Sequence, residues 1–423
     1  MKELQNPERF LITGGIPLHG TVVIDGAKNS ALSIMAACLL TSEKCILENV
    51  PQLKDVYSMI EVIKTLGVKV EWKENNTLYI DSDDFNNFEA PYELVKTMRA
   101  SFLVMGPLLA RLNKAKISLP GGCAIGARPV DFHLKGFRAL GADIITEKGY
   151  IQAEVKRLKG NDIYFDFPSL GATENIMMAA SLAEGITMIE NAAKDPEVIE
   201  LGNFLNKMGA KVNGLGSDII TIEGVKRLKG VKYRIIPDRI EAGTYMVAAA
   251  ITGGTVEIDN VNPSYLKSCI VKLEEAGIKV EIKEDDNIII SNTDAIKSVD
   301  IKTMPFPGFP TDLQAQFMAL MTIASGTSII TENVFESRFA HAGDLRRMGA
   351  DIKVEGRNCI IKGVKKLSAA PVMASDLRGG AALILASLAA EGTTEISRIY
   401  HIDRGYVRIE DKLSNLGAKI KRE

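Results

Sequence analysis

A six-fold internal repeat constrains the fold of this 423-residue chain more than any other feature. Six times, an apolar residue that ends a helical pattern is followed by a glycine and then by a β-rich run, as in LGVKV and MGADI. The repeated glycines are Gly67, Gly141, Gly209, Gly277, Gly349 and Gly417. Their spacings of 74, 68, 68, 72 and 68 residues predict six similar units of about 70 residues that fill the chain.

Each unit carries two helical patterns of different character. The upstream segment is apolar nearly all round, as in NSALSIMAACLL, and this predicts a buried helix. The helix before each repeated glycine is amphipathic; in the first unit Val56, Met59 and Ile60 begin an i, i+3, i+4 pattern. Gly67 then suits the left-handed position that ends a helix. Each unit is therefore predicted to run buried helix, strand, amphipathic helix, strands.

The repeat predicts an α/β fold with two domains of three units each. A unit that hides one helix completely must pack inside an assembly of several units. The sixth unit stops without its final strand, whereas the N-terminus opens with the strand pattern FLITGG…GTVVIDG, which would complete it. We therefore predict one domain at 28–236 and a discontinuous domain formed by 1–27 and 237–423. The alternative is an open solenoid, which the unit length disfavours because solenoid repeats usually span 20–50 residues.

The composition excludes several classes of protein. Fifty-one Lys and Arg against 53 Asp and Glu disfavour a general nucleic-acid or membrane-surface binder. The longest apolar stretch, 381–390, is too short to span a bilayer, and the first ten residues lack the apolar core of a signal peptide. Five scattered cysteines without a CxxC pair, and four ungrouped histidines, argue against disulfides and a metal site. We expect a cytoplasmic protein without a metal.

Polar residues stand at the heads of the buried helices. They are Lys28, Asn29, Arg99, Ser169, Glu174, Arg239, Glu241, Asp312, Asp376 and Arg378. Helix N-termini attract anions, so six such ends converging from two domains would form a cleft rich in donors. Capping is the alternative for Ser169, Asp312 and Asp376. A cation at a helix start opposes the dipole, so Lys28, Arg99 and Arg378 are assigned to anion binding.

A glycine-rich loop at 119–136, LPGGCAIGARPVDFHLKG, is a candidate lid. A lone cysteine is most often a small buried hydrophobe. Cys123, however, stands among glycines with Arg128 and Asp131 close behind. A thiol in such surroundings can donate a proton or attack as a thiolate. The other four cysteines lie in apolar patterns and are interpreted as structural.

A third charged cluster lies near the C-terminus, in RIYHIDRGYVRIEDKL. Arg404, followed directly by a glycine at a strand-to-helix junction, is its best ligand candidate. Arg408 and Glu410 are expected to form a solvated face. His341 and His401 could act as general bases, although ordinary hydrogen-bonded histidines are the simpler interpretation.

Six motifs together closely resemble the UDP-N-acetylglucosamine 1-carboxyvinyltransferases, the enolpyruvyl transferases that begin peptidoglycan synthesis. They are GAKNSAL, KTMRAS, PGGCAIGARPVD, FPTDLQAQF, ENVFESRFAH and RIYHIDRGY. The resemblance covers essentially the whole chain and is most specific in PGGC…ARPVD. It implies an inside-out α/β barrel of two three-repeat domains with a cleft between them. It also implies that the enolpyruvyl group of phosphoenolpyruvate moves to the 3′-hydroxyl of UDP-N-acetylglucosamine through a tetrahedral ketal, with release of phosphate and without a cofactor.

The resemblance also assigns binding roles by motif. Phosphoenolpyruvate would be held by Lys28, Asn29, Arg128, Arg378 and Arg404. The UDP-sugar would be lined by Arg99, Arg128, Pro129, Val130, Asp131, Phe132, Ser169, Asp312 and Val334. Clamping of phosphate and carboxylate suits the fork of arginine and the point charge of lysine. Some relatives carry lysine in DKVSVGAT where this chain has Phe167, so that nucleotide contact cannot be transferred.

The resemblance implies catalytic roles for Cys123, Asp312, Lys28, Asp376 and Arg404. Cys123 would be the general acid that protonates the methylene carbon, and it can also form a covalent adduct with phosphoenolpyruvate. Asp312 would accept the 3′-hydroxyl proton, and Asp376 would steer the pyruvyl carbon. The lysine and arginine set, including Lys28 and Arg404, would stabilise the charge of the transition state.

Two other functions remain open at this point. The sister enzyme 3-phosphoshikimate 1-carboxyvinyltransferase shares the fold but lacks the cysteine-bearing loop. A catalytically silent paralogue that binds a UDP-sugar would be a protein of another class. Intact Cys123, Lys28 and Asp312 argue against it. The sequence leaves the oligomeric state undetermined.

Overall fold

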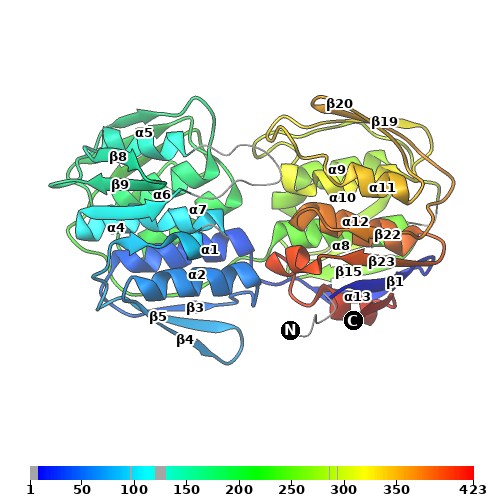
Figure 1. Cartoon of the computed structure of the whole chain (residues 1–423), viewed down its shortest axis with the longest axis horizontal. Helices are drawn as coiled ribbons and strands as arrows, with labels where there is room; N and C mark the ends of the chain where they lie inside the picture. Colours follow the sequence, from blue (N-terminus) through cyan, green and yellow to red (C-terminus); the bar gives the residue numbers. More distant parts are fainter. Residues whose placement is uncertain (1–7, 96–97, 120–129, 285, 293) are drawn as a thin grey trace. The chain divides into compact units, whose positions relative to one another are not determined.

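The computed structural model describes residues 8–95, 98–119, 130–284, 286–292 and 294–423. The described residues form two compact units. The N-unit comprises residues 26–119 and 130–236, and the C-unit comprises residues 8–25 and 237–423. Figure 1 colours both by sequence, with the first strands of the chain in dark blue.

The N-unit contains the first three repeats. Its buried helices are α1 (Lys28–Ala37), α4 (Met105–Leu112) and α6 (Leu170–Ala180). Its amphipathic helices are α2 (Lys54–Thr65), α5 (Asp131–Ala139) and α7 (Pro196–Lys207). Shorter helices are η1 (Cys38–Leu40), α3 (Tyr92–Val95) and η2 (Arg99–Val104). The strands are β3 (Cys45–Glu48), β4 (Lys69–Lys73), β5 (Thr77–Asp81), β6 (Glu89–Ala90), β7 (Lys114–Ser118), β8 (Asp143–Glu147), β9 (Tyr150–Glu154), β10 (Asp162–Tyr164), β11 (Ile186–Glu190), β12 (Lys211–Asn213), β13 (Ile219–Glu223) and β14 (Lys232–Arg234).

The C-unit contains the other three repeats and the N-terminal strands. Its buried helices are α8 (Arg239–Thr252), α10 (Gln314–Met321) and α12 (Leu377–Ala389). Its other helices are η3 (Pro263–Leu266), α9 (Lys267–Glu275), η4 (Thr311–Leu313), α11 (Ala342–Arg347), η5 (Ile399–Arg404) and α13 (Ile409–Asn415). The strands are β1 (Phe10–Thr13), β2 (His19–Val23), β15 (Thr255–Asp259), β16 (Lys279–Ile282), β17 (Ile288–Ser291), β18 (Ile301–Lys302), β19 (Thr327–Thr331), β20 (Asp351–Glu355), β21 (Asn358–Lys362), β22 (Pro371–Met373), β23 (Thr393–Ser397) and β24 (Lys419–Arg422).

The sheets repeat one topology. In the described part of the chain there are six sheets of four strands, and each joins one parallel pair to two antiparallel neighbours. In the sheet β10-β11-β13-β12, for example, β10 and β11 are parallel, while β13 is antiparallel to both β11 and β12. The recurrence of this order confirms that the repeat seen in the sequence is a structural repeat.

The N-terminal segment completes the sixth repeat, as its strand pattern predicts. Strand β1 lies between β23 and β24 and is antiparallel to both, with Phe10 opposite Ile396 on one side and Arg422 on the other. Strand β2 adds to the fourth repeat by pairing in parallel with β15. Two of the three sheets described in the C-unit are therefore completed by residues that are more than 200 positions away in the sequence.

The repeated glycines adopt the predicted left-handed conformation. Their φ angles lie between 89° and 102° at all six positions. A residue with a Cβ atom is strained in this region, which explains why the helix ends at a glycine each time.

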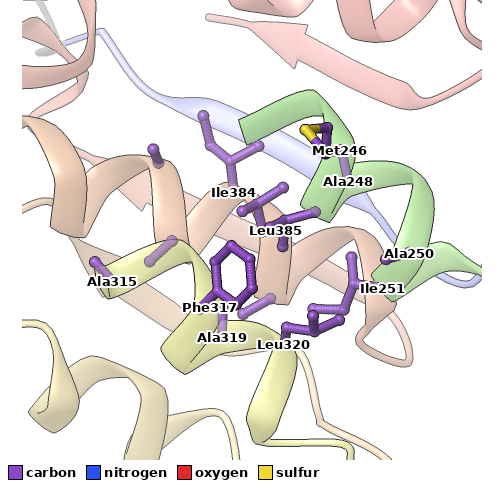
Figure 2. Close-up of a cluster of buried hydrophobic side chains, with 14 of the residues drawn as sticks. Met246, Ala248, Ala250, Ile251, Ala315, Phe317, Ala319, Leu320, Ile384 and Leu385 are labelled. Atoms are coloured by element: carbon purple, nitrogen blue, oxygen red, sulfur yellow. The ribbon is translucent and has the colours of Figure 1, made fainter. Parts of the chain in front are cut away.

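The core of the C-unit is formed by the three buried helices. Figure 2 shows Met246 and Ile251 of α8, Phe317 and Leu320 of α10, and Leu385 of α12 gathered in one cluster. All five side chains are at most 4% exposed. Small residues on these helices, mainly alanine, allow the backbones to approach closely. None of the helices in the described residues is both long and apolar enough to cross a membrane.

Two local expectations are corrected by the structure. Arg99 does not head an α-helix: it begins the 3₁₀ helix η2, and α4 starts only at Met105. Pro107 explains this, because it has no N–H to donate and is tolerated only in the first turn of an α-helix. Glu410 is not solvated: its side chain is 14% exposed and pairs with Arg422 at 2.7 Å, whereas Arg408 is exposed as expected.

Candidate functional site

Asp312 is the centre of the charged cluster in the C-unit. It lies in η4, which leads into buried helix α10. Its Oδ1 accepts a hydrogen bond from Arg338 at 2.6 Å and its Oδ2 accepts one from Arg378 at 3.1 Å. Both guanidinium groups are 5% exposed, whereas the Asp312 side chain is 26% exposed. The Asp312 carboxylate is thus accessible, whereas the two arginines that bind it are buried.

The head of α12 supplies two predicted residues with different roles. Asp376 is the N-cap, and its Oδ1 accepts hydrogen bonds from the backbone N–H groups of Arg378 and Gly379. Burial favours the neutral carboxyl, but the hydrogen bond from Gly379 and nearby positive charge outweigh it and lower the pKa of Asp376. Capping, the alternative weighed for this residue, is therefore one of its functions.

Arg378 is held from its other side by a buried polar network. Its Nη1 donates to the Tyr406 hydroxyl at 3.3 Å. That hydroxyl lies 2.9 Å from Thr244 Oγ1 and accepts from Gln316 Nε2. Because Thr244 donates to the carbonyl of Ile240, the Tyr406 proton is directed to Thr244. Burial alone would lower the pKa of Arg378, but the Asp312 charge raises it, so the guanidinium remains cationic.

Arg404 is the last residue of η5 and comes shortly before Tyr406, which belongs to this network. The next residue, Gly405, packs so closely on Leu377 of α12 that a Cβ would approach its side chain to 2.6 Å. Arg398 and Arg408, which flank this segment, both have positive φ angles, 57° and 42°. Such strained conformations in residues other than glycine persist only where the surrounding structure fixes them, and they are frequent at functional sites.

His341 lies next to the same cluster but is not placed to act as a base. It is 1% exposed, and burial, with a further contribution from Arg338, lowers its pKa to about 4 against the influence of Asp376. Its Nε2 has no hydrogen-bond partner among the described residues. His401 instead lies against Tyr400, with ring centroids 4.2 Å apart.

The N-unit presents its own set of predicted residues, beginning with Lys28. Lys28 is the first residue of α1, and its Nζ lies 2.6 Å from Asp55 Oδ2. The two side chains are 11% and 4% exposed. Asn29 follows in the same helical turn and is half-buried. The ion pair supplies a structural partner for a cation whose position at a helix start first suggested anion binding.

Arg99 and Ser169, two residues of the predicted UDP-sugar wall, belong to the surroundings of His133 on α5. Ser169 caps α6 by accepting from the Ala172 N–H at 3.4 Å, and a Cβ on the neighbouring Gly171 would lie 3.4 Å from the His133 ring. Burial, followed by the nearby charge of Arg99, lowers the pKa of His133 to about 3. Arg99, His133 and the head of α6 are therefore close together.

The structure also describes four other residues of the predicted UDP-sugar site. Asp131 is exposed, Val130 is 6% exposed, and Phe132 packs on Phe165 with ring centroids 5.9 Å apart. In the C-unit, the backbone N–H of Val334 donates to Glu332 at 2.8 Å. Cys123, Arg128 and Pro129 lie outside the described residues.

The comparisons with known proteins agree across the whole chain. A family model described as EPSP synthase (3-phosphoshikimate 1-carboxyvinyltransferase) matches residues 12–413. A UDP-N-acetylglucosamine 1-carboxyvinyltransferase 1 of Caldanaerobacter subterraneus is 60% identical over 98% of this chain and 99% of its own length. The chain belongs to the UDP-N-acetylglucosamine 1-carboxyvinyltransferase family. Another member, from Carboxydothermus hydrogenoformans, is 56% identical over 98% of this chain and 99% of its own.

Solved structures show the same enolpyruvyl transferase fold. The enolpyruvyl transferase NikO from Streptomyces tendae aligns with a TM-score of 0.89 at 23% identity, over 98% of this chain and 99% of its own. EPSP synthase from Acinetobacter baumannii aligns with a TM-score of 0.76 at 20% identity, over 98% of this chain and 100% of its own. This likeness confirms the predicted fold class.

In this carboxyvinyltransferase family member, some residues of the site were missed by sequence reasoning. Arg338 lies in the motif ENVFESRFAH but was given no role, and Asp55, His133 and Tyr406 were not predicted as partners. Tyr406 follows the Arg404–Gly405 pair directly, so its place in HIDRGY was the available signal. Asp55 stands in the first turn of an amphipathic helix, where an acidic residue also has a dipole explanation, so no signal distinguished it.

The predicted site residues do not line the cavity described in the C-unit. The described residues contain no group of three or more His, Cys, Asp or Glu side chains that could hold a metal ion. A cavity of about 750 Å³ is lined by residues such as Tyr265, Lys272 and Phe306, and none of the predicted site residues lines it.

Proposed function

We propose that the chain transfers the enolpyruvyl group of phosphoenolpyruvate to the 3′-hydroxyl of UDP-N-acetylglucosamine and releases phosphate. The observation that carries the proposal is the arrangement of Asp312: an accessible carboxylate whose two oxygens are held by two buried guanidinium groups. The near-full-length relatives bear the name of this activity. The substrates of this activity are small molecules.

The proposed reaction is an addition followed by an elimination. The 3′-hydroxyl oxygen attacks C2 of phosphoenolpyruvate while Asp312 takes the hydroxyl proton. Cys123 delivers a proton to the methylene carbon C3. The product of this step is a tetrahedral ketal. Loss of a proton from the C3 methyl group and cleavage of the C2–O bond to phosphate then give the enol ether and inorganic phosphate. General acid–base steps of this kind typically contribute about 10²–10⁴-fold each.

The cations are proposed to bind the anionic substrate. Lys28, Asn29, Arg128, Arg378 and Arg404 hold the phosphate and carboxylate of phosphoenolpyruvate and stabilise the charge of the transition state. Arg378 suits this role because its guanidinium remains cationic although it is 4% exposed. Asp376, ionised at the head of α12, steers the pyruvyl carbon.

The UDP-sugar is proposed to contact the His133 neighbourhood and the Val334 loop. The residues concerned are Arg99, Arg128, Pro129, Val130, Asp131, Phe132, Ser169, Asp312 and Val334. Phe167, 40% exposed, stands where some relatives carry a lysine, so this wall offers an aromatic surface in place of that cation. We further propose that the domains are 28–236 and 1–27 with 237–423, and that the protein works in the cytoplasm.

A phosphate-release assay tests the proposed function directly. Phosphate should appear only when phosphoenolpyruvate and UDP-N-acetylglucosamine are both present. Release with shikimate 3-phosphate as acceptor would instead identify the sister activity. Binding of the UDP-sugar without phosphate release would identify a silent paralogue.

Lys28→Ala is expected to lower kcat/KM for phosphoenolpyruvate about 10- to 100-fold, the effect of losing one charge-assisted hydrogen bond. It also leaves Asp55, whose side chain is 4% exposed, without its ammonium partner and should reduce stability. The double variant Lys28→Ala/Asp55→Asn is the matched control. It should recover the melting temperature but not the activity; recovery of both would make Lys28 a structural residue only.

Cys123 is expected to be the only cysteine alkylated by a small anionic epoxide that mimics phosphoenolpyruvate. Cys38, Cys45, Cys269 and Cys359 are buried, and burial raises the pKa of Cys269 and Cys359 to about 12. Cys123→Asp should resist the reagent yet keep activity, because a carboxylic acid can still donate a proton. Peptide mapping that finds the label on a buried cysteine would contradict this placement.

A further inference from the structure

We infer that Glu332 and Thr311 are positioning residues that hold Arg338 against Asp312 and thereby fix the proton-accepting carboxylate. The inference rests on the proposed function for the identity of the reaction, but its geometry stands within the C-unit alone. Neither residue was assigned a role by the motifs of the sequence.

Glu332 is a buried carboxylate that accepts four hydrogen bonds. It follows β19 and is 1% exposed. Its Oε1 accepts from the Thr303 hydroxyl at 2.8 Å and from the backbone N–H groups of Val334 and Phe335 at 2.8 and 3.1 Å. Its Oε2 accepts from the Thr311 hydroxyl at 2.8 Å. Three donors on Oε1 and one on Oε2 engage both oxygens, so Glu332 is held in one orientation.

Thr311 transmits that orientation to Arg338. A hydroxyl has one proton to donate, and here it goes to Glu332 Oε2. The lone pairs of Thr311 Oγ1 are therefore directed to Arg338, whose Nη1 donates to it at 2.8 Å. Because the two bonds run in a fixed sense, the hydroxyl acts as a one-way link from Glu332 to the guanidinium.

Arg338 is restrained on a second side by the loop that Glu332 organises. The guanidinium lies over the Phe335 ring, 5.1 Å from its centroid, and the Phe335 N–H is one of the donors to Glu332. With its Nη1 on Thr311 and its face on Phe335, Arg338 has its Nη2 left to reach Asp312 at 2.6 Å. Glu332 thus aims the guanidinium through two separate contacts.

The neutral hydroxyl between Glu332 and Arg338 has an electrostatic consequence. A direct pair of these two buried groups would satisfy the Arg338 charge internally and weaken its hold on Asp312. With Thr311 interposed, the closest carboxylate to Arg338 is Asp312 at 2.6 Å. The positive charge of Arg338 is therefore directed to Asp312. Among the four hydrogen-bonded residues Glu332, Thr311, Arg338 and Asp312, only Asp312 is proposed to react.

A pair of substitutions at Thr311 tests the link. Thr311→Val keeps the shape but removes the hydroxyl, and should lower kcat about 10- to 100-fold while KM for both substrates changes less than about three-fold. Thr311→Ser restores the hydroxyl and should restore kcat to within about three-fold of the parent. A role in stability alone would move the melting temperature and not separate kcat from KM in this way.

Thr303→Val is the matched control on the same carboxylate. It removes one donor to Glu332 Oε1 without touching Arg338 or Asp312. It should lower the melting temperature but leave kcat within about three-fold of the parent. Equal kcat losses in Thr303→Val and Thr311→Val would overturn the inference, because the Thr311 hydroxyl would then have no effect of its own through its contact with Arg338. So would full activity in Thr311→Val.

Crystal structures separate a failure of the inference from a failure of the proposed function. If the parent protein releases no phosphate from the two substrates, the proposed reaction is wrong, yet the positioning is still measurable. The Arg338 guanidinium should turn away from Asp312 in Thr311→Val and return in Thr311→Ser. An unmoved Arg338 in Thr311→Val would refute the link, whatever the reaction is.

Discussion

Asp312→Asn is expected to lower kcat for phosphate release about 10³-fold and to change KM for either substrate less than about three-fold. An amide has the size of the carboxylate but cannot accept the 3′-hydroxyl proton. The asparagine oxygen can still accept from Arg338, the closer of the two guanidinium groups, so this contact should persist. Steady-state phosphate release and calorimetric binding of UDP-N-acetylglucosamine provide the two measurements.

Asp238→Asn is the control for this substitution. Asp238 is 7% exposed, caps α8 by accepting from the N–H groups of Ile240 and Glu241, and contributes to the electrostatics of Arg378. Asparagine is an equally good N-cap, so activity should remain within about three-fold of the parent. If Asp312→Asn raised KM with kcat unchanged, Asp312 would bind substrate without taking the proton.

Most of the fold could be predicted because its signals are local and repeated six times. A helix that is apolar all round can only be buried, and a glycine after an amphipathic helix marks a left-handed end whatever lies beyond it. Even the long-range pairing of β1 with the last repeat followed from counting strands. The boundary of α4 could not be predicted as easily, because the apolar run from 100 to 110 hides the change of helix type at Met105.

The candidate site was predicted less completely, since its residues were recognised by motif and their partners were not. Nothing local to Asp312 shows that two arginines, 26 and 66 positions away, hold its oxygens. Glu410 was misplaced for the same reason: its partner Arg422 is brought to it by the strand order of the last sheet. Charged residues are read as solvated unless a tertiary contact says otherwise, and tertiary contacts of this kind leave no periodic trace.

Buried acidic groups that take no part in the reaction are expected to have a large effect on the stability of the fold. Glu200 on α7 is 3% exposed, and its Oε1 accepts from the N–H of Ile236 at 2.8 Å. Burial, with a smaller contribution from Glu197, raises the pKa of Glu200 from 4.5 to about 7 even though hydrogen bonding opposes the shift. Glu174 of α6, which is 1% exposed, has its pKa raised by burial as well. The N-unit therefore folds around carboxyl groups that prefer to be neutral.

Glu200→Gln is accordingly expected to stabilise the protein at pH 8 and to stabilise it much less at pH 5, near the lower end of the titration window. The folded-state pKa lies above the unfolded one, so the native state binds more protons between about pH 4.5 and pH 7, and stability falls as pH rises through that window. Above pH 7 the full cost is present, about 3 kcal/mol for this shift. Glutamine has no charge to bury, and its oxygen can still accept from Ile236.

Urea unfolding of the parent and the variant at both pH values measures the difference. Glu61→Gln is the control, because Glu61 lies on α2 of the same unit with its side chain 58% exposed, and its replacement should change stability by less than about 0.5 kcal/mol at either pH. A gain for Glu200→Gln that is equal at pH 5 and pH 8 would come from packing. A loss at pH 8 would mean that the charged form is stabilised by the hydrogen bond to Ile236 more strongly than burial opposes it, and the direction of the Glu200 pKa shift would then be wrong.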